Sequence, residues 1–371
     1  MLRLNDLIKI NYLPQVSNQA LLPKNAIYVL SRFISMRMNE ENLEVESVIT
    51  NAKITLMHTI ANNLIFQLRR PCTMHNLDAD IDQILLQQFI KILYLIGIIT
   101  YRDENNNPHD EVQHNLLQWE WHDLVFHQKS RKSRADAPHG GTFRFKEMIK
   151  PLKNLKSPMA SESIKLPSMN IKKIDKDLPF QVVLNQRRSR REPVEKSLPL
   201  PILAEFLQRA CEIQVIHTDQ IYENTQRRYP SGGGIHELEI YFYAQSVTDL
   251  TPAIYHYLPL EHALEKLDIG EPNLLPHFVK SYQVASANAG VPHVLFAITA
   301  RFNRVNWKYS EMAYALILKN VGVLYQTFYL VATAMNLRPC AIGSGSSRLF
   351  SDLINLSHFD ESVVGEFILS A

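Results

Sequence analysis

The second half of the chain alternates apolar runs that have strand-like and helical spacing. Continuous or alternating apolar residues predict strands near Leu238–Ala244, Ala253–Leu258 and Val294–Thr299. Apolar residues three and four positions apart predict helices near Leu200–Ala210, Leu274–Ala287, Glu311–Leu337 and Phe350–Ile354. A mixed order of this kind predicts an α+β domain.

The first part of the chain reads as a separate small domain. Alternating apolar residues between 43 and 57 predict strands, and helices are expected near Ile60–Leu68 and from Ile81 to Leu93. Gly97 ends the second helix, and Ile98–Tyr101 predicts a strand that leads into a polar turn. This order is compatible with a winged-helix unit. Because its second helix presents glutamines rather than a basic surface, peptide or protein docking is favoured over DNA binding.

Two stretches connect these parts. Residues 111–134, with Trp119 and Trp121, predict a connector helix. Residues 150–179 contain four prolines among lysines and serines, which is typical of a long irregular linker. The expected organisation is therefore a winged-helix-like docking domain at 1–134, a linker at 135–180 and a second domain at 181–371.

Composition narrows the class of protein. The 371 residues are 46% hydrophobic and 20% charged, with a net charge of +2, so no overall attraction to nucleic acid is expected. Cys72, Cys211 and Cys340 are far apart, which favours neither a disulfide framework nor a zinc site and fits a reducing cytoplasm. No signal peptide is recognisable, no metal site is predicted, and the apolar run from Val321 to Met335 is interpreted as a buried helix rather than a membrane span.

Three short segments carry candidate chemistry. A cluster of arginines around a serine suits a phosphate, because guanidinium groups and a hydroxyl supply several donors; it comprises Arg187, Arg188, Ser189, Arg190 and Arg191. A Pro-Ser followed by three glycines, from Pro230 to Gly234, lets main-chain N–H groups approach a flat or phosphorylated ligand. A third, backbone-rich run spans residues 341–347. Taken singly, these segments equally fit a solvated basic face, an ordinary turn and a helix cap.

In this order and spacing, the segments resemble the SagB-type dehydrogenases, which are azoline oxidases of the FMN-dependent nitroreductase superfamily. The resemblance runs from about Leu184 to the end. The pattern R-R-S-x-R matches Arg187 to Arg191, and Y-P-S-x-G-x-x-H matches Tyr229 to His236. The longer pattern Y-H-Y-x-P-L-x-H-x-L-E matches Tyr255 to Glu265. The family's catalytic Lys-Tyr pair falls on Lys308 and Tyr309.

The resemblance implies a nitroreductase-like sheet flanked by helices and an intertwined homodimer with two FMN sites at the subunit interface. It places the FMN phosphate on Arg187, Arg188, Ser189 and Arg191. The isoalloxazine ring would lie against the main chain of Ser231, Gly232, Gly233, Ile342 and Gly343. Lys308 would act as general base, provided that desolvation brings its pKa down, and Tyr309 would position the ring or share the proton.

The implied substrate is a ribosomally made precursor peptide with thiazoline or oxazoline rings, formed earlier by a cyclodehydratase or heterocyclase complex. Removal of two electrons and two protons gives the thiazole or oxazole. Molecular oxygen is the expected final acceptor, because no nicotinamide-binding fingerprint follows a predicted strand.

Some positions depart from the family pattern. Asn320, Val323 and Thr327 replace an acidic residue, a histidine and an asparagine of the long helix, and no basic residue for the flavin phosphate lies near the C-terminus. Two alternatives therefore stay open. One is an NAD(P)H-dependent FMN reductase of small molecules, and the other is a non-catalytic scaffold in a heterocyclase complex.

Overall fold

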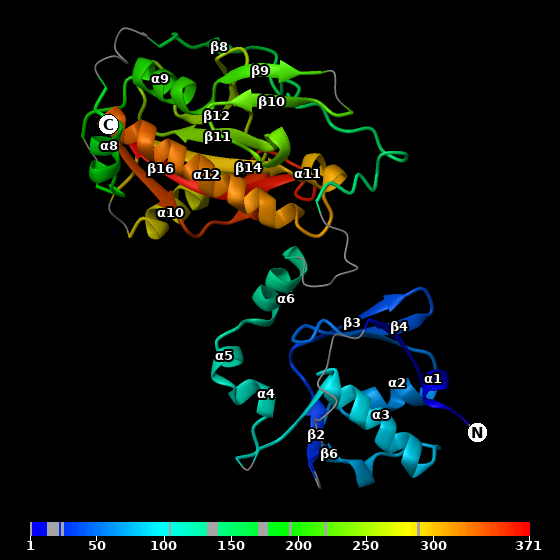
Figure 1. The fold of residues 1–371 in the computed structure, drawn as a ribbon. Helices are drawn as coiled ribbons and strands as arrows, with labels where there is room; N and C mark the ends of the chain where they lie inside the picture. The colour runs from blue at the N-terminus through cyan, green and yellow to red at the C-terminus, as the bar shows by residue number, and fades with distance from the viewer. Residues whose placement is uncertain are drawn as a thin grey trace. The chain divides into compact units, whose positions relative to one another are not determined.

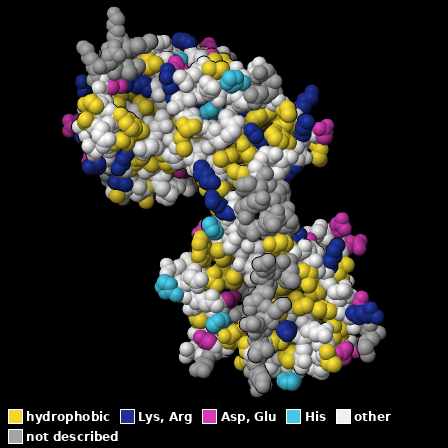
Figure 2. All heavy atoms as spheres, in the orientation of Figure 1, with side chains coloured by type: hydrophobic (Ala, Val, Ile, Leu, Met, Phe, Trp, Pro, Cys, Tyr) yellow, Lys and Arg dark blue, Asp and Glu magenta, His cyan; other side chains and the backbone are white. Residues whose placement is uncertain are grey.

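The computed structural model describes residues 2–12, 22–23, 26–103, 105–131, 140–169, 177–192, 195–218, 221–287 and 290–371. The chain divides into two compact units, Met1–Ala137 and Pro138–Ala371 (Figure 1). On the face drawn in Figure 2, dark blue basic and magenta acidic side chains are interspersed on both units, as a net charge of +2 leads us to expect.

The first unit contains two antiparallel sheets and a pair of longer helices. One sheet has the order β1-β5-β4-β3, formed by Ile8–Tyr12, Lys53–Leu56, Asn42–Ser47 and Ile34–Asn39. The other has the order β6-β2-β7, formed by Cys72–Thr73, Ile27–Leu30 and Ile99–Tyr101. The helices are α1 (Leu4–Leu7), α2 (Thr59–Gln67), the 3₁₀ turn η1 (Met74–Asn76) and α3 (Gln83–Leu95). Asp82 caps α3, because its Oδ1 accepts from the N–H groups of Ile84 and Leu85, each at 2.9 Å.

The order α2, α3, β7 is the one that the apolar pattern predicts, but the single connector helix is wrong. Three short helices stand in its described part: α4 (His109–Val112), α5 (His114–Leu117) and α6 (Trp121–Ser130). The main-chain carbonyls of Leu116 and Trp119 accept hydrogen bonds from the Arg32 guanidinium, each at 3.3 Å. These carbonyls therefore bind a side chain instead of the N–H groups of a continuing helix. The expected end of the connector at residue 134 lies outside the described residues.

The second unit is built on an antiparallel sheet of order β15-β16-β14-β11-β12-β13-β8. Its strands are Arg338–Ile342, Glu361–Ser370, Val294–Arg301, Leu238–Ala244, Ala253–Leu258, Ala263–Lys266 and Ile164–Lys165, in that spatial order. A separate hairpin pairs β9 (Ile213–His217) with β10 (Asn224–Arg227). The helical elements are α8 (Phe180–Gln186), α9 (Leu200–Cys211), η2 (Gly232–Gly234), η3 (Pro272–Leu274), α10 (Leu275–Ala285), α11 (Phe302–Lys308), α12 (Ala313–Ala334) and α13 (Ser347–Leu353).

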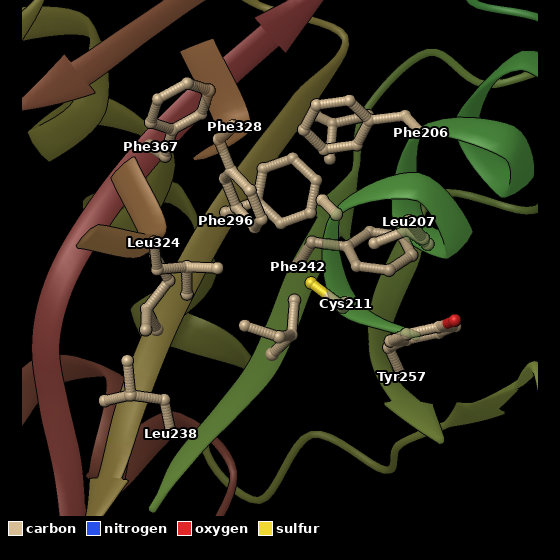
Figure 3. Close-up of a cluster of buried hydrophobic side chains, with 14 of the residues drawn as sticks. Phe206, Leu207, Cys211, Leu238, Phe242, Tyr257, Phe296, Leu324, Phe328 and Phe367 are labelled. Atoms are coloured by element: carbon tan, nitrogen blue, oxygen red, sulfur yellow. The ribbon is translucent and has the colours of Figure 1, made fainter. Parts of the chain in front are cut away.

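Helices cover both faces of this sheet, which explains why β11 and β14 are buried along their whole length without alternation. Phe206 of α9 and Phe328 of α12 pack against Phe296 and Phe367 on one face (Figure 3). A second cluster lies on the other face, where α10 and α13 contribute Phe278, Tyr282, Phe350 and Leu353. The predicted α+β class is confirmed.

Within the described residues, α12 is the one helix that is long and apolar enough to cross a membrane by length and composition. Val321, Leu324 and Phe328 of this helix are buried in the core of the second unit. Core packing therefore accounts for the apolar residues on this side of the helix.

Candidate active site

Lys308 and Tyr309 lie where α11 ends, beside the glycine turn η2. The N–H of Tyr309 still donates to the Val305 carbonyl at 2.8 Å, so the helix fixes the pair. The Lys308 ammonium donates to the Gly233 carbonyl at 3.4 Å. The sequence-predicted catalytic pair and the glycine turn are therefore brought together.

The turn has no room for side chains. Gly233 has a φ of 67°, and a Cβ built on it would lie 2.5 Å from the Tyr309 hydroxyl and 2.8 Å from the Lys308 Nζ. A Cβ on Gly232 would lie 2.4 Å from the Leu316 side chain. Glycine is required here by both conformation and close approach. The exposed main chain of the turn can consequently be reached by a flat ligand next to Lys308 and Tyr309.

Asn320 of α12 holds this turn in place. Its Oδ1 accepts from the Gly232 N–H at 3.1 Å, and its Nδ2 donates to the Ser231 Oγ at 3.1 Å. The same Nδ2 donates to the Glu237 Oε1 at 2.8 Å. An acidic residue at position 320 would face the Glu237 carboxyl instead, so the departure from the family pattern has a clear structural use in this chain.

The charged groups around the turn are shifted from their ordinary states. Desolvation by burial and the nearby Arg304 guanidinium lower the pKa of Lys308. Burial raises the pKa of Tyr309, so its phenol stays neutral. Burial also raises the pKa of Glu237, although the hydrogen bond from Asn320 opposes this. A lysine held closer to its neutral form is suited to accept a proton.

The segment predicted to be a linker covers the catalytic pair. Residues 140–166, which we call the strap, are anchored to α11 from both ends of that helix. The N–H groups of Thr142 and Phe143 donate to the Lys308 carbonyl at 2.9 and 3.1 Å. The Trp307 indole donates to the Ile149 carbonyl at 2.6 Å, and Arg301 donates to the carbonyl of Asn154 at 2.9 Å. The described part of the expected linker is thus structured and forms one wall of the site.

The longest motif match forms the hairpin of β12 and β13 and has a structural role. The two ring nitrogens of His256 face Glu265 at 2.9 Å and Glu239 at 3.2 Å. Burial lowers the pKa of His256, but these two carboxylates outweigh it and raise the pKa overall. Glu265 in turn accepts from the N–H groups of Met159 and Ala160 and so fastens the strap.

The arginine cluster lies at the other end of α12. It follows the C-terminal end of α8, whose C-cap is Arg187. A helix C-terminus carries partial negative charge and is stabilised by adjacent cations. Ser189 Oγ contacts the Tyr329 hydroxyl at 2.7 Å, and that hydroxyl accepts from the Ala341 N–H at 2.8 Å. Arg188 and Arg191 are exposed.

Two clusters of candidate residues therefore exist in one chain. Asn320, beside the glycine turn, and Tyr329, beside the arginines, are nine residues apart on α12, which separates them by about 14 Å along the helix axis. In Figure 1, α12 begins near α11 and ends near α8. Ser231, Gly232 and Gly233 group with Lys308, whereas Arg187, Ser189 and Ile342 group at the far end.

The loop after β15 is open on one side and closed on the other. A Cβ on Gly343 would meet no atom within 4 Å, whereas one on Gly345 would overlap the Glu366 carboxylate at 1.6 Å. Ile342 pairs with Glu366 of β16. Burial raises the pKa of Glu366 to about 7. Glu366 could not be recognised from the sequence, because the interpretation of this region depended on the lack of a basic residue.

Comparisons with known proteins identify the family to which this chain belongs. A model of the nitroreductase family matches residues 184–369, and a model described as the cyanobactin oxidase ThcOx matches residues 28–136. The chain belongs to the nitroreductase family. It is accordingly an oxidoreductase of a family whose members typically bind a flavin, and the predicted resemblance is confirmed.

Individual relatives show how far the similarity extends. A protein named as a nitroreductase of Methanocaldococcus jannaschii is 23% identical over 183 residues, which cover 49% of this chain and 87% of that protein. The microcin B17-processing protein McbC of Escherichia coli is 30% identical over 119 residues, which cover 31% of this chain and 43% of McbC. Among solved structures, the E. coli microcin synthetase McbBCD complex with truncated pro-MccB17 bound matches with a TM-score of 0.43 and 18% identity, over 66% of this chain and 90% of that one.

Among the described residues, no group of three or more histidine, cysteine, aspartate or glutamate side chains could hold a metal ion. Sequence reasoning noted Asn320 only as a departure from the family pattern and did not find its role, and it missed the strap and Arg304. The spacing of Arg304, four residues before Lys308 and therefore on the same face of a helix, was the signal that could have revealed it.

Proposed function

We propose that this chain is an FMN-dependent azoline dehydrogenase, which oxidises thiazoline or oxazoline rings of a precursor peptide to thiazole or oxazole. The observation that carries the proposal is the contact of Lys308 with Gly233. This contact puts an amine of lowered pKa beside a turn in which the glycines present main chain alone, which a flat ligand can approach. The family match and the relative named as a microcin-processing protein support the reaction class.

The residues present fit FMN. Arg187, Arg188, Ser189 and Arg191 would hold its phosphate, because several of these donors are exposed next to the open Gly343 loop. The main chain of Ser231, Gly232, Gly233, Ile342 and Gly343 would contact the ring system. When bound, FMN would accept the two electrons that leave the azoline ring.

Within this arrangement, Lys308 takes the proton from the ring carbon. The Lys308 Nζ lies 5.9 Å from the Phe143 ring centroid and 5.2 Å from the Tyr222 ring centroid. These two rings partly shield the amine from water. The Tyr309 hydroxyl lies over the Gly233 Cα and remains protonated, which suits it to orient the ring or to share the proton.

A homodimer would unite the two clusters. One FMN molecule would take its phosphate contacts, and the ring contacts of Ile342 and Gly343, from the arginine end of one chain. Its other ring contacts would come from the glycine turn of a second copy. The separation of about 14 Å along α12 supports this division, because the two ends of one helix cannot meet in the same chain.

The first unit would dock the precursor peptide. A cavity of about 600 Å³ lies between β2, β6 and α3, with Tyr28, Thr73, Met74, Ile84 and Gln88 among its lining residues. This mixture of apolar surface and amide groups suits an extended peptide, and β6 is the edge strand of its sheet. Ile84→Asp is expected to weaken binding of a fluorescent precursor peptide without changing flavin content. Equal peptide affinity in the variant would place docking elsewhere.

The substrate chemistry points to a partner and a compartment. Because the rings must exist before oxidation, a cyclodehydratase or heterocyclase complex is the proposed partner. Cys72, Cys211 and Cys340 are free thiols. We place the protein in the cytoplasm, where such thiols stay reduced.

The test begins with the visible absorption spectrum of the purified protein and the mass of the released chromophore. Stoichiometric FMN and conversion of an azoline peptide, detected as the loss of two hydrogen atoms in mass, are expected. Rapid bleaching of the flavin by NADPH without azoline oxidation would favour a reductase of small molecules. A colourless protein that does not bind added FMN would favour a non-catalytic scaffold role.

A further inference from the structure

Arg304 is a buried guanidinium whose hydrogen-bond partners are main-chain carbonyls. Its side chain is on α11, one helical turn before Lys308, and the residue is 1% exposed. It donates to the Ile235 carbonyl from Nε at 3.2 Å and from Nη2 at 2.9 Å, to the Glu223 carbonyl at 2.9 Å, and to the Leu152 carbonyl of the strap. Carbonyl groups solvate the positive charge but do not neutralise it.

Arg301, three residues earlier, is the natural comparison. It too is buried and donates to the strap, at the carbonyls of Lys153 and Asn154. In contrast to Arg304, it forms a salt bridge with Glu239 at 3.3 Å. Glu239 also acts on Arg304 through space, but it is already shared by Arg301 and His256. The charge of Arg301 is therefore balanced locally, whereas that of Arg304 is not.

The Tyr222 ring joins Arg304 to Lys308. Its centroid lies 5.0 Å from the Arg304 Cζ and 5.2 Å from the Lys308 Nζ, and the ring stacks on Trp307 of α11 at 6.0 Å. Burial raises the pKa of Tyr222 far above neutrality, so the phenol adds no negative charge between the two cations. Both cations therefore share one uncharged ring.

The other titratable groups near Lys308 do not offset Arg304. Tyr309 is neutral, and Glu237, behind the glycine turn, is hydrogen-bonded to Asn320 and has a raised pKa. The strap presents Phe143, which is uncharged, to the amine. In the part of the chain that the structure describes, Lys308 forms no salt bridge with a carboxylate, and its polar contact is the Gly233 carbonyl.

We infer that Arg304 is a positioning residue whose fixed positive charge, one helical turn before Lys308 and against the same Tyr222 ring, favours the neutral amine of Lys308. This inference rests on the proposed function only for its catalytic meaning, since the charge effect on Lys308 exists without any reaction. A like charge in a poorly solvated site disfavours a second cation, whereas an exposed lysine is not affected in this way.

The shifts in the pKa values of Lys308 and Arg304 have the direction that this inference requires. Desolvation lowers the pKa of Lys308 first, and Arg304 lowers it further. Burial lowers the pKa of Arg304 itself to about 10, which leaves the guanidinium charged at neutral pH. Arg304 thus remains a permanent cation under the conditions in which Lys308 must lose its proton.

The test measures the titration of Lys308 directly in the full-length protein. Acetic anhydride labelling at a series of pH values, read by peptide mass spectrometry, gives the labelling midpoint of each lysine. Lys319 on α12, which is exposed, serves as the internal reference. Arg304→Gln removes the unbalanced charge, and Arg301→Gln is the matched control that removes a strap anchor whose charge is balanced.

Three results would support the inference together. Lys308 labels with a lower midpoint than Lys319 in the unaltered protein, Arg304→Gln moves that midpoint to higher pH, and Arg301→Gln leaves it in place. Each unit of upward shift lowers labelling at pH 7 by about tenfold. In azoline turnover, kcat of Arg304→Gln would fall at neutral pH and recover at higher pH, with KM unchanged.

Other results would overturn it. Equal midpoints of Lys308 and Lys319 in the unaltered protein would do so without any variant, and this comparison still decides if Arg304→Gln fails to fold. Equal effects of the two arginine substitutions would make Arg304 a strap anchor only. Failure of the proposed function is separate: full turnover in Lys308→Met would remove the base assignment while the labelling midpoints in the unaltered protein stayed the same.

Discussion

The two ends of α12 differ in how their polar groups are satisfied. At the start of the helix, Asn320, Ser231 and Glu237 form a closed hydrogen-bond set around the glycine turn. At its end, Arg188 donates, within the described part of the chain, to the carbonyls of Asn185 and Arg187, and Arg191 is exposed. The first end is preorganised by the protein itself, whereas the second presents cations that a bound phosphate would order.

This difference separates two tasks that a flavoenzyme must perform. Proton transfer depends on fixed geometry and a tuned pKa, and the lysine end is accordingly partly buried and held by hydrogen bonds within the protein. Binding of a charged cofactor tail depends on available donors, so the arginine end is open. Substitutions at the first end should therefore change rate or stability, and substitutions at the second should change flavin affinity.

The largest expected effect comes from Lys308→Met, which keeps an apolar stem and removes the amine. Turnover of an azoline peptide should fall by about 10²–10⁴-fold, because that is the usual contribution of a general base. Flavin content should stay at the level of the unaltered protein. Steady-state oxidation followed by mass spectrometry, with Lys319→Met as an exposed control, measures both. Loss of flavin together with activity would mean that Lys308 anchors the cofactor instead.

Asn320→Asp should give the next largest effect, now on stability. The change removes two hydrogen-bond donations and places a second carboxylate against Glu237 in a buried site. The free energy of unfolding should drop by about 3 kcal/mol, as measured by chemical denaturation.

Asn303→Asp is the matched control for that experiment. The Asn303 amide also donates to a carboxylate, that of Asp360, at 2.8 Å, but the pair is exposed. It should cost no more than about 0.5 kcal/mol. Similar losses in the two variants would show that the glycine turn is not held by Asn320.

The sequence was most informative where one interaction dominates. Apolar periodicity predicted the strands at Leu238 and Ala253 and the helix at Leu200, because burial against the sheet determines all three. It missed β16, which lies between β15 and β14, because Gly365 and Glu366 interrupt the apolar residues of this strand. Nor could it reveal the strap, whose shape depends on single hydrogen bonds donated by Trp307 and Arg301 and accepted by Glu265 rather than on any repeating pattern.

In the candidate site, too, the sequence indicated individual residues but not the contacts between distant segments. The family resemblance pointed to Lys308 and to the arginine cluster, and the structure describes both in defined environments. It could not show that the two lie at opposite ends of α12, because the spacing of residues along the chain does not tell which part of α12 each segment contacts. The role of Asn320 was hidden for the same reason: its three partners lie more than eighty residues away in the chain.

Glu366→Gln tests the open end through pH. The folded-state pKa of this carboxyl is raised to about 7, so the folded protein holds a proton that the unfolded chain releases above its ordinary value. Stability should therefore fall as pH rises toward 7 and level off above it. The amide removes this loss, and the variant should be more stable than the unaltered protein at pH 8 by about 3 kcal/mol, with no difference at pH 4. Equal stability at both pH values would mean that the Glu366 carboxyl is well solvated.

The smallest effect is expected for Arg191→Gln. One exposed guanidinium contributes a single charge-assisted contact, so flavin affinity should fall by about tenfold while turnover at saturating FMN stays unchanged. Arg348→Gln is the control, because Arg348 is equally exposed but already paired with Asp352 at 3.0 Å. Fluorescence titration of FMN at two salt concentrations measures the change, and the unaltered protein should show the steeper salt dependence. If Arg191→Gln and Arg348→Gln bind FMN equally well, the phosphate lies away from Arg191, and the assignment of the open end must rest on Arg187, Arg188 and Ser189 alone.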